Sequence, residues 1–125
     1  MSPMSGGPMP KPTAGARAAF EALVPDDPRV AVRPMFGNVA AFVNGNMFAG
    51  LFGEDLFVGL GERERAAVVE QGGRAFEPVA GRPMKEYVVV PGTWSSDPGA
   101  ARAWLDRSLD GARELPPKEA RRKRA

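Results

Sequence analysis

Cationic side chains stand at two distant points of the sequence where they could bind an anionic ligand. Arg33 and Arg82 each precede a proline and lie near a methionine, and Lys85 follows shortly after the second arginine. If the segments that carry these residues approach one another in the fold, their guanidinium and ammonium groups form a patch for a carboxylate or a phosphate. The alternative is an ordinary surface, on which each arginine packs its stem across a sheet and pairs with Glu77 or Glu86.

Methionine and phenylalanine residues of the same central segments could line an apolar pocket, because the methionine side chain adapts to irregular ligands. These residues are Met35, Met47, Met84, Phe36, Phe48 and Phe57. Since both residue types are usually buried, the alternative is that they fill the hydrophobic core. Trp94, in the segment Gly-Thr-Trp-Ser-Ser, is expected to be partly exposed and is a further candidate contact for a partner.

Histidine and cysteine are both absent from the sequence, which excludes several kinds of chemistry. Disulfide bonds, thiol redox reactions, Cys/His zinc sites and hydrolases of the Ser–His or Cys–His type all require them. The acidic pairs Asp26-Asp27 and Glu54-Asp55 have too few oxygens for a calcium site and are typical of turns. Tyr87, the single tyrosine, has no evident titrating partner. We therefore expect no catalytic residues, no cofactor and no metal.

The net charge of +2 is concentrated at the C-terminal end of the chain. Residues 118–124 hold one acidic residue and five basic ones, namely Lys118, Arg121, Arg122, Lys123 and Arg124. This segment contributes +4, so the remaining 12 basic and 14 acidic residues give −2. Such a segment attracts phosphate backbones without reading sequence, because it releases counterions. The alternative is a solvated end that aids solubility.

The chain of 125 residues is long enough for one domain of ordinary size. We predict a flexible leader over residues 1–12, a folded domain over residues 13–115 and a disordered basic tail over residues 116–125. The polar N-terminal segment is not typical of a secretory signal, and the sequence contains no long apolar run. A cytoplasmic location is therefore expected.

Hydrophobic periodicity predicts an α+β domain with an antiparallel sheet of five to six strands. Helices are expected over residues 13–23, 62–71 and 97–113, and strands over residues 30–36, 39–43, 46–52, 56–60, 75–79 and 84–90. Four strands separated by tight turns must be antiparallel, because a parallel crossover needs about a dozen residues. The order is helix, four strands, helix, two strands, helix. Gly59-Leu60-Gly61 precedes the second helix but lacks the third glycine of a dinucleotide-binding loop.

An ordered set of motifs resembles the N-terminal domain of the TfoX/Sxy family. The motifs are Arg33-Pro34-Met35-Phe36-Gly37, Val43-Asn44-Gly45-Asn46-Met47-Phe48-Ala49, Leu56-Phe57-Val58, Phe76-Glu77-Pro78, residues 81–91 and the Trp104-Leu105 pair of the last helix. The resemblance covers residues 15–113. It implies a small α+β domain with an antiparallel sheet, related to regulators of natural competence and transcription. The resemblance supplies no established catalytic residues.

Three functional hypotheses follow from these observations. The first is a non-enzymatic regulatory domain that acts through protein contacts, including self-association into a homodimer at an exposed sheet edge. The second is weak, sequence-independent binding of nucleic acid by the basic tail. The third is a small-molecule sensor or enzyme that uses the Arg33 and Arg82 region with the Met and Phe residues, and it requires a concave pocket with convergent polar groups.

Overall fold

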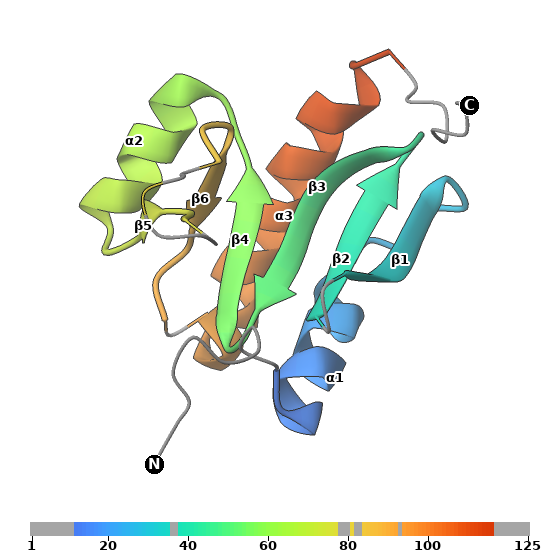
Figure 1. Ribbon diagram of the computed structural model, residues 1–125, viewed down its shortest axis with the longest axis horizontal. Helices are drawn as coiled ribbons and strands as arrows, with labels where there is room; N and C mark the ends of the chain where they lie inside the picture. The colour runs from blue at the N-terminus through green and yellow to red at the C-terminus, as the bar shows by residue number, and fades with distance from the viewer. Residues whose placement is uncertain (1–11, 36–37, 78–80, 82–83, 93, 117–125) are drawn as a thin grey trace.

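The computed structural model describes residues 12–35, 38–77, 81, 84–92 and 94–116, and in these ranges the chain forms an antiparallel sheet and three α-helices (Figure 1). The helices are α1 (Ala14–Leu23), α2 (Glu62–Glu70) and α3 (Pro98–Arg113). The strands are β1 (Val30–Met35), β2 (Asn38–Val43), β3 (Asn46–Phe52), β4 (Asp55–Gly59), β5 (Arg74–Ala75) and β6 (Tyr87–Val89). Their order in the sheet is β1-β2-β3-β4-β6-β5. The α+β class and the expected order of elements are confirmed.

Helix ends follow the capping residues that the sequence supplies. The hydroxyl of Thr13 accepts a hydrogen bond from the backbone N–H of Ala16 at 3.1 Å, which satisfies one of the free amides of the first turn of α1. The carboxylate of Asp97 does the same for Ala100 at 3.3 Å, and Pro98 occupies the first position of α3. Both helix starts therefore lie where the sequence predicts them.

Turns fix the register of the strands. Asn44 and Gly45, between β2 and β3, have φ values of 52° and 81°, so both central residues of this hairpin adopt the left-handed conformation that its sequence predicts. Asp27, in the turn before β1, accepts hydrogen bonds from the backbone and the side chain of Arg29. These bonds lower the pKa of Asp27 to about 2. The acidic pair that includes Asp27 thus serves a turn.

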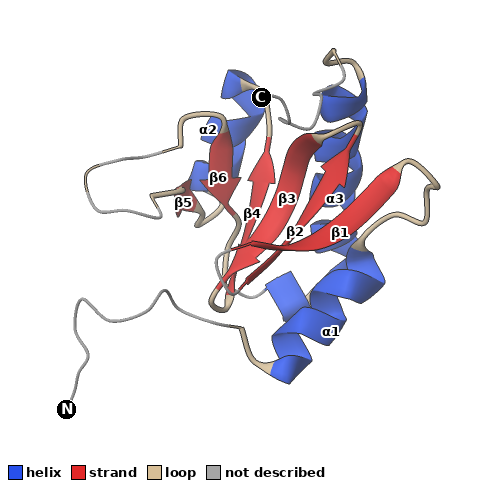
Figure 2. Cartoon of the chain, turned by 45° about the vertical axis from the view of Figure 1, so that its right-hand side comes forward, coloured by secondary structure: helices blue, strands red, loops and turns tan. Residues whose placement is uncertain are grey.

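The main core lies between the sheet and the helices. In Figure 2, α1 and α3 lie together on one side of the sheet. Phe20 of α1, Leu105 of α3 and Val68 of α2 pack against the side chains of the central strands that point to this face. The largest fully buried side chains of this core include Phe20, Phe48, Leu51, Leu56 and Leu105. Their burial is the main favourable contribution to folding.

A second, smaller cluster covers the opposite face of β4 and β6. The rings of Phe57 and Phe76 stack with centroids 4.1 Å apart and an interplanar angle of 11°. Tyr87 meets Phe57 edge to face at 5.8 Å. Phe57 and Phe76 are buried, and the half-buried side chains of Met47, Phe52, Met84 and Tyr87 surround them. Residue 76 therefore holds the chain after β5 against the sheet.

Two glycines make room for these aromatic rings. Gly50 of β3 pairs with Phe57 of β4, and a Cβ at residue 50 would lie 2.6 Å from Cζ of Phe57 and 3.0 Å from the carbonyl oxygen of Val39. Gly59 of β4 pairs with Tyr87 of β6, and a Cβ at residue 59 would lie 3.1 Å from the ring of Tyr87. In each pair the aromatic ring lies across the neighbouring glycine and covers its backbone.

The last two strands are shorter than the sequence predicts. β5 has only two residues, Arg74 and Ala75, whereas the predicted strand covers residues 75–79, of which 78 and 79 lie outside the described part of the chain. Phe76 leaves the strand and turns into the second cluster, while its carbonyl accepts a hydrogen bond from the N–H of Met84 at 2.9 Å. Residues 84–86 form a turn rather than the start of a strand, because the N–H of Tyr87 bonds to the carbonyl of Met84 at 3.1 Å.

β1 and β5 are the edge strands of the sheet. β1 carries Arg33 and Pro34, which is without an amide hydrogen, and β5 has only two residues. A charge, a proline and a very short strand are devices that discourage pairing with another chain. Within the described residues, no helix has the length and apolar character needed to cross a bilayer.

We expect Gly50→Ala to lower the free energy of unfolding by about 1 to 3 kcal/mol, because the added methyl group overpacks the core. Phe57 cannot move aside, since Phe76 stacks on its ring. Unfolding in urea, followed by circular dichroism, measures the effect. The control is Gly111→Ala on α3, where a Cβ has nothing within 4 Å and should stabilise the helix by about 0.5 to 1 kcal/mol. Equal stabilities of the two variants would contradict this prediction.

Candidate functional site

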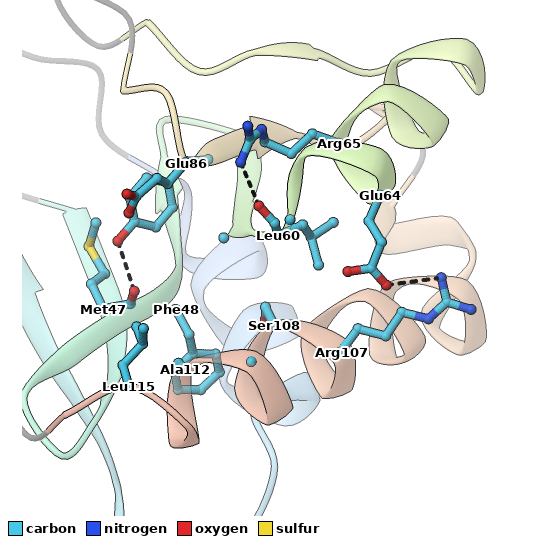
Figure 3. Close-up of a pocket in the computed structure, with 14 residues that line it drawn as sticks. Met47, Phe48, Leu60, Glu64, Arg65, Glu86, Arg107, Ser108, Ala112 and Leu115 are labelled. Carbon is cyan, nitrogen blue, oxygen red and sulfur yellow. Dashed lines mark hydrogen bonds and ion pairs between the residues drawn. The ribbon is translucent and has the colours of Figure 1, made fainter.

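A cavity of about 340 Å³ lies where α2 and α3 meet the ends of β3, β4 and β6 (Figure 3). This volume falls at the lower end of the range of about 300 to 1,000 Å³ that small-molecule pockets occupy. Three of its lining residues are glycines, Gly59, Gly61 and Gly111, and a Cβ at either of the last two would have nothing within 4 Å. Small residues at these positions leave the space between the helices and the sheet unfilled.

Apolar side chains form one part of the wall. Phe48 of β3, Leu60 after β4 and Ala112 of α3 are buried there. Met47 is half-buried, and Leu115 keeps 50% of its surface exposed at the mouth. In Figure 3, Phe48 and Ala112 lie on the side of the hollow opposite to Arg65. A ligand with an apolar body would therefore find a matching surface.

Polar groups converge from the two helices. The Nη1 atom of Arg65 donates a hydrogen bond to the carbonyl oxygen of Leu60 at 2.6 Å, which fixes the guanidinium beside the cavity. The guanidinium of Arg107 lies 3.9 Å from the carboxylate of Glu64, so this pair is loose. The hydroxyl of Ser108 donates to the carbonyl oxygen of Leu105 at 2.9 Å. The wall thus combines an apolar part with a charged rim.

Tyr87 closes the side of the cavity next to β3. Its hydroxyl donates a hydrogen bond to the carbonyl oxygen of Met47 at 2.8 Å. Burial of the phenol raises the pKa of Tyr87 above its usual value, and the nearby carboxylate of Glu86 raises it further. The group stays protonated at neutral pH, so it holds the backbone of Met47 as a hydrogen-bond donor and cannot act as a base there.

Arg33 and Lys85, the two described residues of the cationic patch expected from the sequence, do not come together. Arg33 lies on the edge strand β1, while Lys85 lies in the turn before β6, and β2, β3 and β4 separate the two strands. The guanidinium of Arg33 lies over the ring of Phe42, 5.1 Å from its centroid. Glu77 accepts a hydrogen bond from the N–H of Gly81. Arg82 and residues 118–124 lie outside the described part of the chain.

The expectation that Trp94 is partly exposed is wrong. Its side chain is 3% exposed and belongs to the main core. The reason is a short 3-10 helix, Trp94–Ser96, which contacts α1 and α3 and turns the indole inward. The indole N–H donates to the carbonyl oxygen of Glu54 at 3.0 Å, so the polar end of the ring is satisfied inside the protein.

The Met and Phe residues divide between the core and the cavity. Phe57 is buried in the second cluster with Met84 beside it, while Met47 and Phe48 line the cavity. Phe36 and the side chain of Met35 lie outside the described part of the chain. Sequence reasoning missed Arg65, Arg107 and Ser108, because nothing in the sequence shows which faces of the two helices meet. The one available signal was the Gly59-Leu60-Gly61 segment, whose two glycines border the cavity.

Acidic side chains do not gather into a metal site anywhere in the described ranges, where no group of three or more could hold an ion.

The fold and the cavity define a small α+β domain in which one antiparallel sheet carries helices on one face. The family model of the TfoX N-terminal domain matches residues 21–112, which extend from within α1 almost to the end of α3. The chain belongs to this family. At the level of the family, the match supports a regulatory, competence-related domain. No curated protein matches the chain significantly.

We expect the phenol of Tyr87 to titrate above pH 10, since its pKa is raised in the folded protein. The folded state then keeps a proton that the unfolded state has lost. Its contribution to stability is complete below about pH 10 and disappears as the pH rises through the folded pKa. Because the chain has one tyrosine, the ultraviolet absorbance of tyrosinate reports this group alone.

Glu86→Gln should lower the midpoint of this titration, and Glu21→Gln on α1 is the control that should leave it unchanged. Circular dichroism at each pH shows whether the chain is still folded. A midpoint at or below that of free tyrosine in the folded protein would contradict the prediction.

Proposed function

We propose that this chain is a non-enzymatic regulatory domain that acts through contacts with another protein. The observation that carries the proposal is the match to the TfoX N-terminal domain over residues 21–112. This range takes in the whole sheet, all of α2, the last residues of α1 and all but the last residue of α3. The family character therefore belongs to the folded domain itself, and the proposed contact is made by its surface.

Exposed apolar side chains support a protein contact. Among the described residues, three large hydrophobic side chains are exposed, with Val32 at 41%, Val69 at 49% and Leu115 at 50%. Val32 lies on β1, whose Arg33 and Pro34 discourage strand pairing. Val69 lies on α2, where Ala66 and Ala67 are exposed as well. The partner contact that we propose therefore centres on α2 rather than on a strand edge.

Val69→Glu should weaken the complex with the partner about tenfold or more, because a carboxylate would be buried in an apolar contact. The full chain is immobilised, a protein captured from the source organism is identified and purified, and its affinity is measured by calorimetry. Val32→Glu is the matched control and should bind as the unaltered chain does. Both residues are exposed, so neither change should alter the thermal unfolding midpoint by much.

Sedimentation of the purified chain separates a second copy from a different partner. A concentration-dependent dimer that Val69→Glu dissociates would make the partner a second copy. If the immobilised chain captures no protein specifically and the purified chain is a monomer at every concentration, the proposed function is contradicted. Equal affinities of the two variants would contradict the role of α2.

A second candidate function is weak binding of nucleic acid without sequence preference. Its support is the net charge of +4 on residues 118–124, while the rest of the chain has a net charge of −2. Five lysine and arginine side chains in so short a segment neutralise phosphates and release counterions. The folded domain would not read bases in this case.

Binding of a DNA duplex should fall steeply with salt, with a slope of log K against log salt of about −4.5 if all five cations contact phosphates. Removal of residues 118–125 should abolish the binding and leave the carbonyl of Pro116 bonded to Asn46. Replacement of the five basic residues by glutamine is the length-matched control and should have the same effect. Fluorescence anisotropy measures the affinity. Binding that survives in either variant would contradict this candidate.

A further inference from the structure

Arg65, which lines the cavity between α2 and α3, has a guanidinium that can bind an anionic ligand. Arg65 uses Nη1 to hold the carbonyl of Leu60. In the described ranges, no carboxylate lies within 4.0 Å of its guanidinium, whereas Arg107, across the cavity, has Glu64 at 3.9 Å. Because the guanidinium has five N–H donors in a rigid plane, the bond to Leu60 fixes its orientation and leaves donors for a second acceptor.

The burial of Arg65 also separates it from an ordinary surface arginine. Arg65 is half-buried, while its neighbours Arg63 and Glu64 on α2 are exposed. A partly desolvated guanidinium binds an anion more strongly than an exposed one, because less water competes for it. Two acidic residues also line the cavity, Glu64 and Glu86. Glu64 is the partner of Arg107, and both acids are exposed at the rim.

The remaining wall gives the ligand its apolar part. Phe48, Leu60 and Ala112 are buried on the cavity side, and Met47 and Leu115 extend this surface toward the mouth. A side chain of methionine adjusts to flat or irregular ligands. The complementary molecule has one anionic group and a compact apolar body, and the volume of about 340 Å³ suits a single or fused ring system.

We propose that this cavity binds a small amphipathic carboxylate, with the carboxylate on the guanidinium of Arg65 and the apolar body against Phe48, Met47 and Ala112. This binding goes beyond the protein contact proposed above, because its ligand is a small molecule inside the cavity and not a protein on the exposed part of α2. It can also be measured on the purified chain without any partner. Failure of the ligand experiment would therefore leave the proposed function untouched, and the reverse holds as well.

The experiment is a titration of the ¹⁵N-labelled full chain with 2-naphthoate, followed by NMR. Shifts of the backbone amides should concentrate on residues 59–61, 65 and 111, which border the cavity. The neutral probe 2-naphthamide has the same ring and should bind about tenfold more weakly, since a charge-assisted hydrogen bond is worth about twice a neutral one. Equal affinities for the two probes, or shifts centred elsewhere, would overturn the proposal.

Two variants locate the site. Arg65→Met should weaken 2-naphthoate about tenfold and leave 2-naphthamide unchanged. Arg63→Met removes the same charge from the exposed face of α2 and should bind both probes as the unaltered chain does.

Gly111→Leu tests the apolar part without altering any charge. Gly111 lines the cavity and a Cβ there has nothing within 4 Å, so we expect a leucine side chain to take up part of the cavity and to weaken the binding of both probes. Circular dichroism and thermal unfolding establish that each variant is folded. Unchanged binding in Gly111→Leu, or an equal loss in Arg63→Met and Arg65→Met, would overturn the proposal.

Discussion

The ring of Phe57 is the constraint on which the outer face of the sheet depends. It lies across Gly50 of the neighbouring strand and stacks on Phe76 at 4.1 Å, so the ring is enclosed from both sides. Phe76 brings the chain back after β5, and Tyr87 closes the cluster edge to face. Through its hydroxyl, Tyr87 then fixes the carbonyl of Met47, which lies at the cavity. The packing around Phe57 thereby positions the part of the cavity wall that Met47 and Tyr87 form at the ends of β3 and β6.

On the face of the sheet that the helices cover, the cavity results from small residues and not from close packing of large ones. α2 is attached by the buried side chain of Val68 and by the close approach of Gly73 to β6, where a Cβ would collide with the carbonyl oxygen of Val89. This contact holds the C-terminal end of α2 against β6. At the other end, glycines replace side chains that would have filled the space beside α3. A firm attachment at one end and small residues at the other produce the cavity.

The sequence predicts the elements better than the site, for physical reasons that particular residues show. Thr13, Asp97, Pro98 and the Asn44-Gly45 turn are local signals, and the structure confirms what they indicate. The positions of Phe76 and Trp94 depend on partners that are distant in the sequence. Phe76 stacks on Phe57 and leaves the strand that the sequence predicts, and Trp94 is buried in the core although the sequence predicts partial exposure. Arg33 and Lys85 lie apart because β2, β3 and β4 separate β1 from β6. Local periodicity predicts where strands lie in the sequence but not their order in the sheet, so this separation could not be predicted. The sequence does not show that Arg65 borders a cavity, because this depends on how α2 and α3 pack in the fold.

The way the sheet ends has a consequence for the behaviour of many copies together. A row of open amides and carbonyls on a long, flat border seeds fibrils, since each added copy extends the same ladder. Here one border carries a proline and a guanidinium, and the other is two residues long. These features disfavour side-by-side strand pairing between folded copies, also where many copies gather at high local concentration.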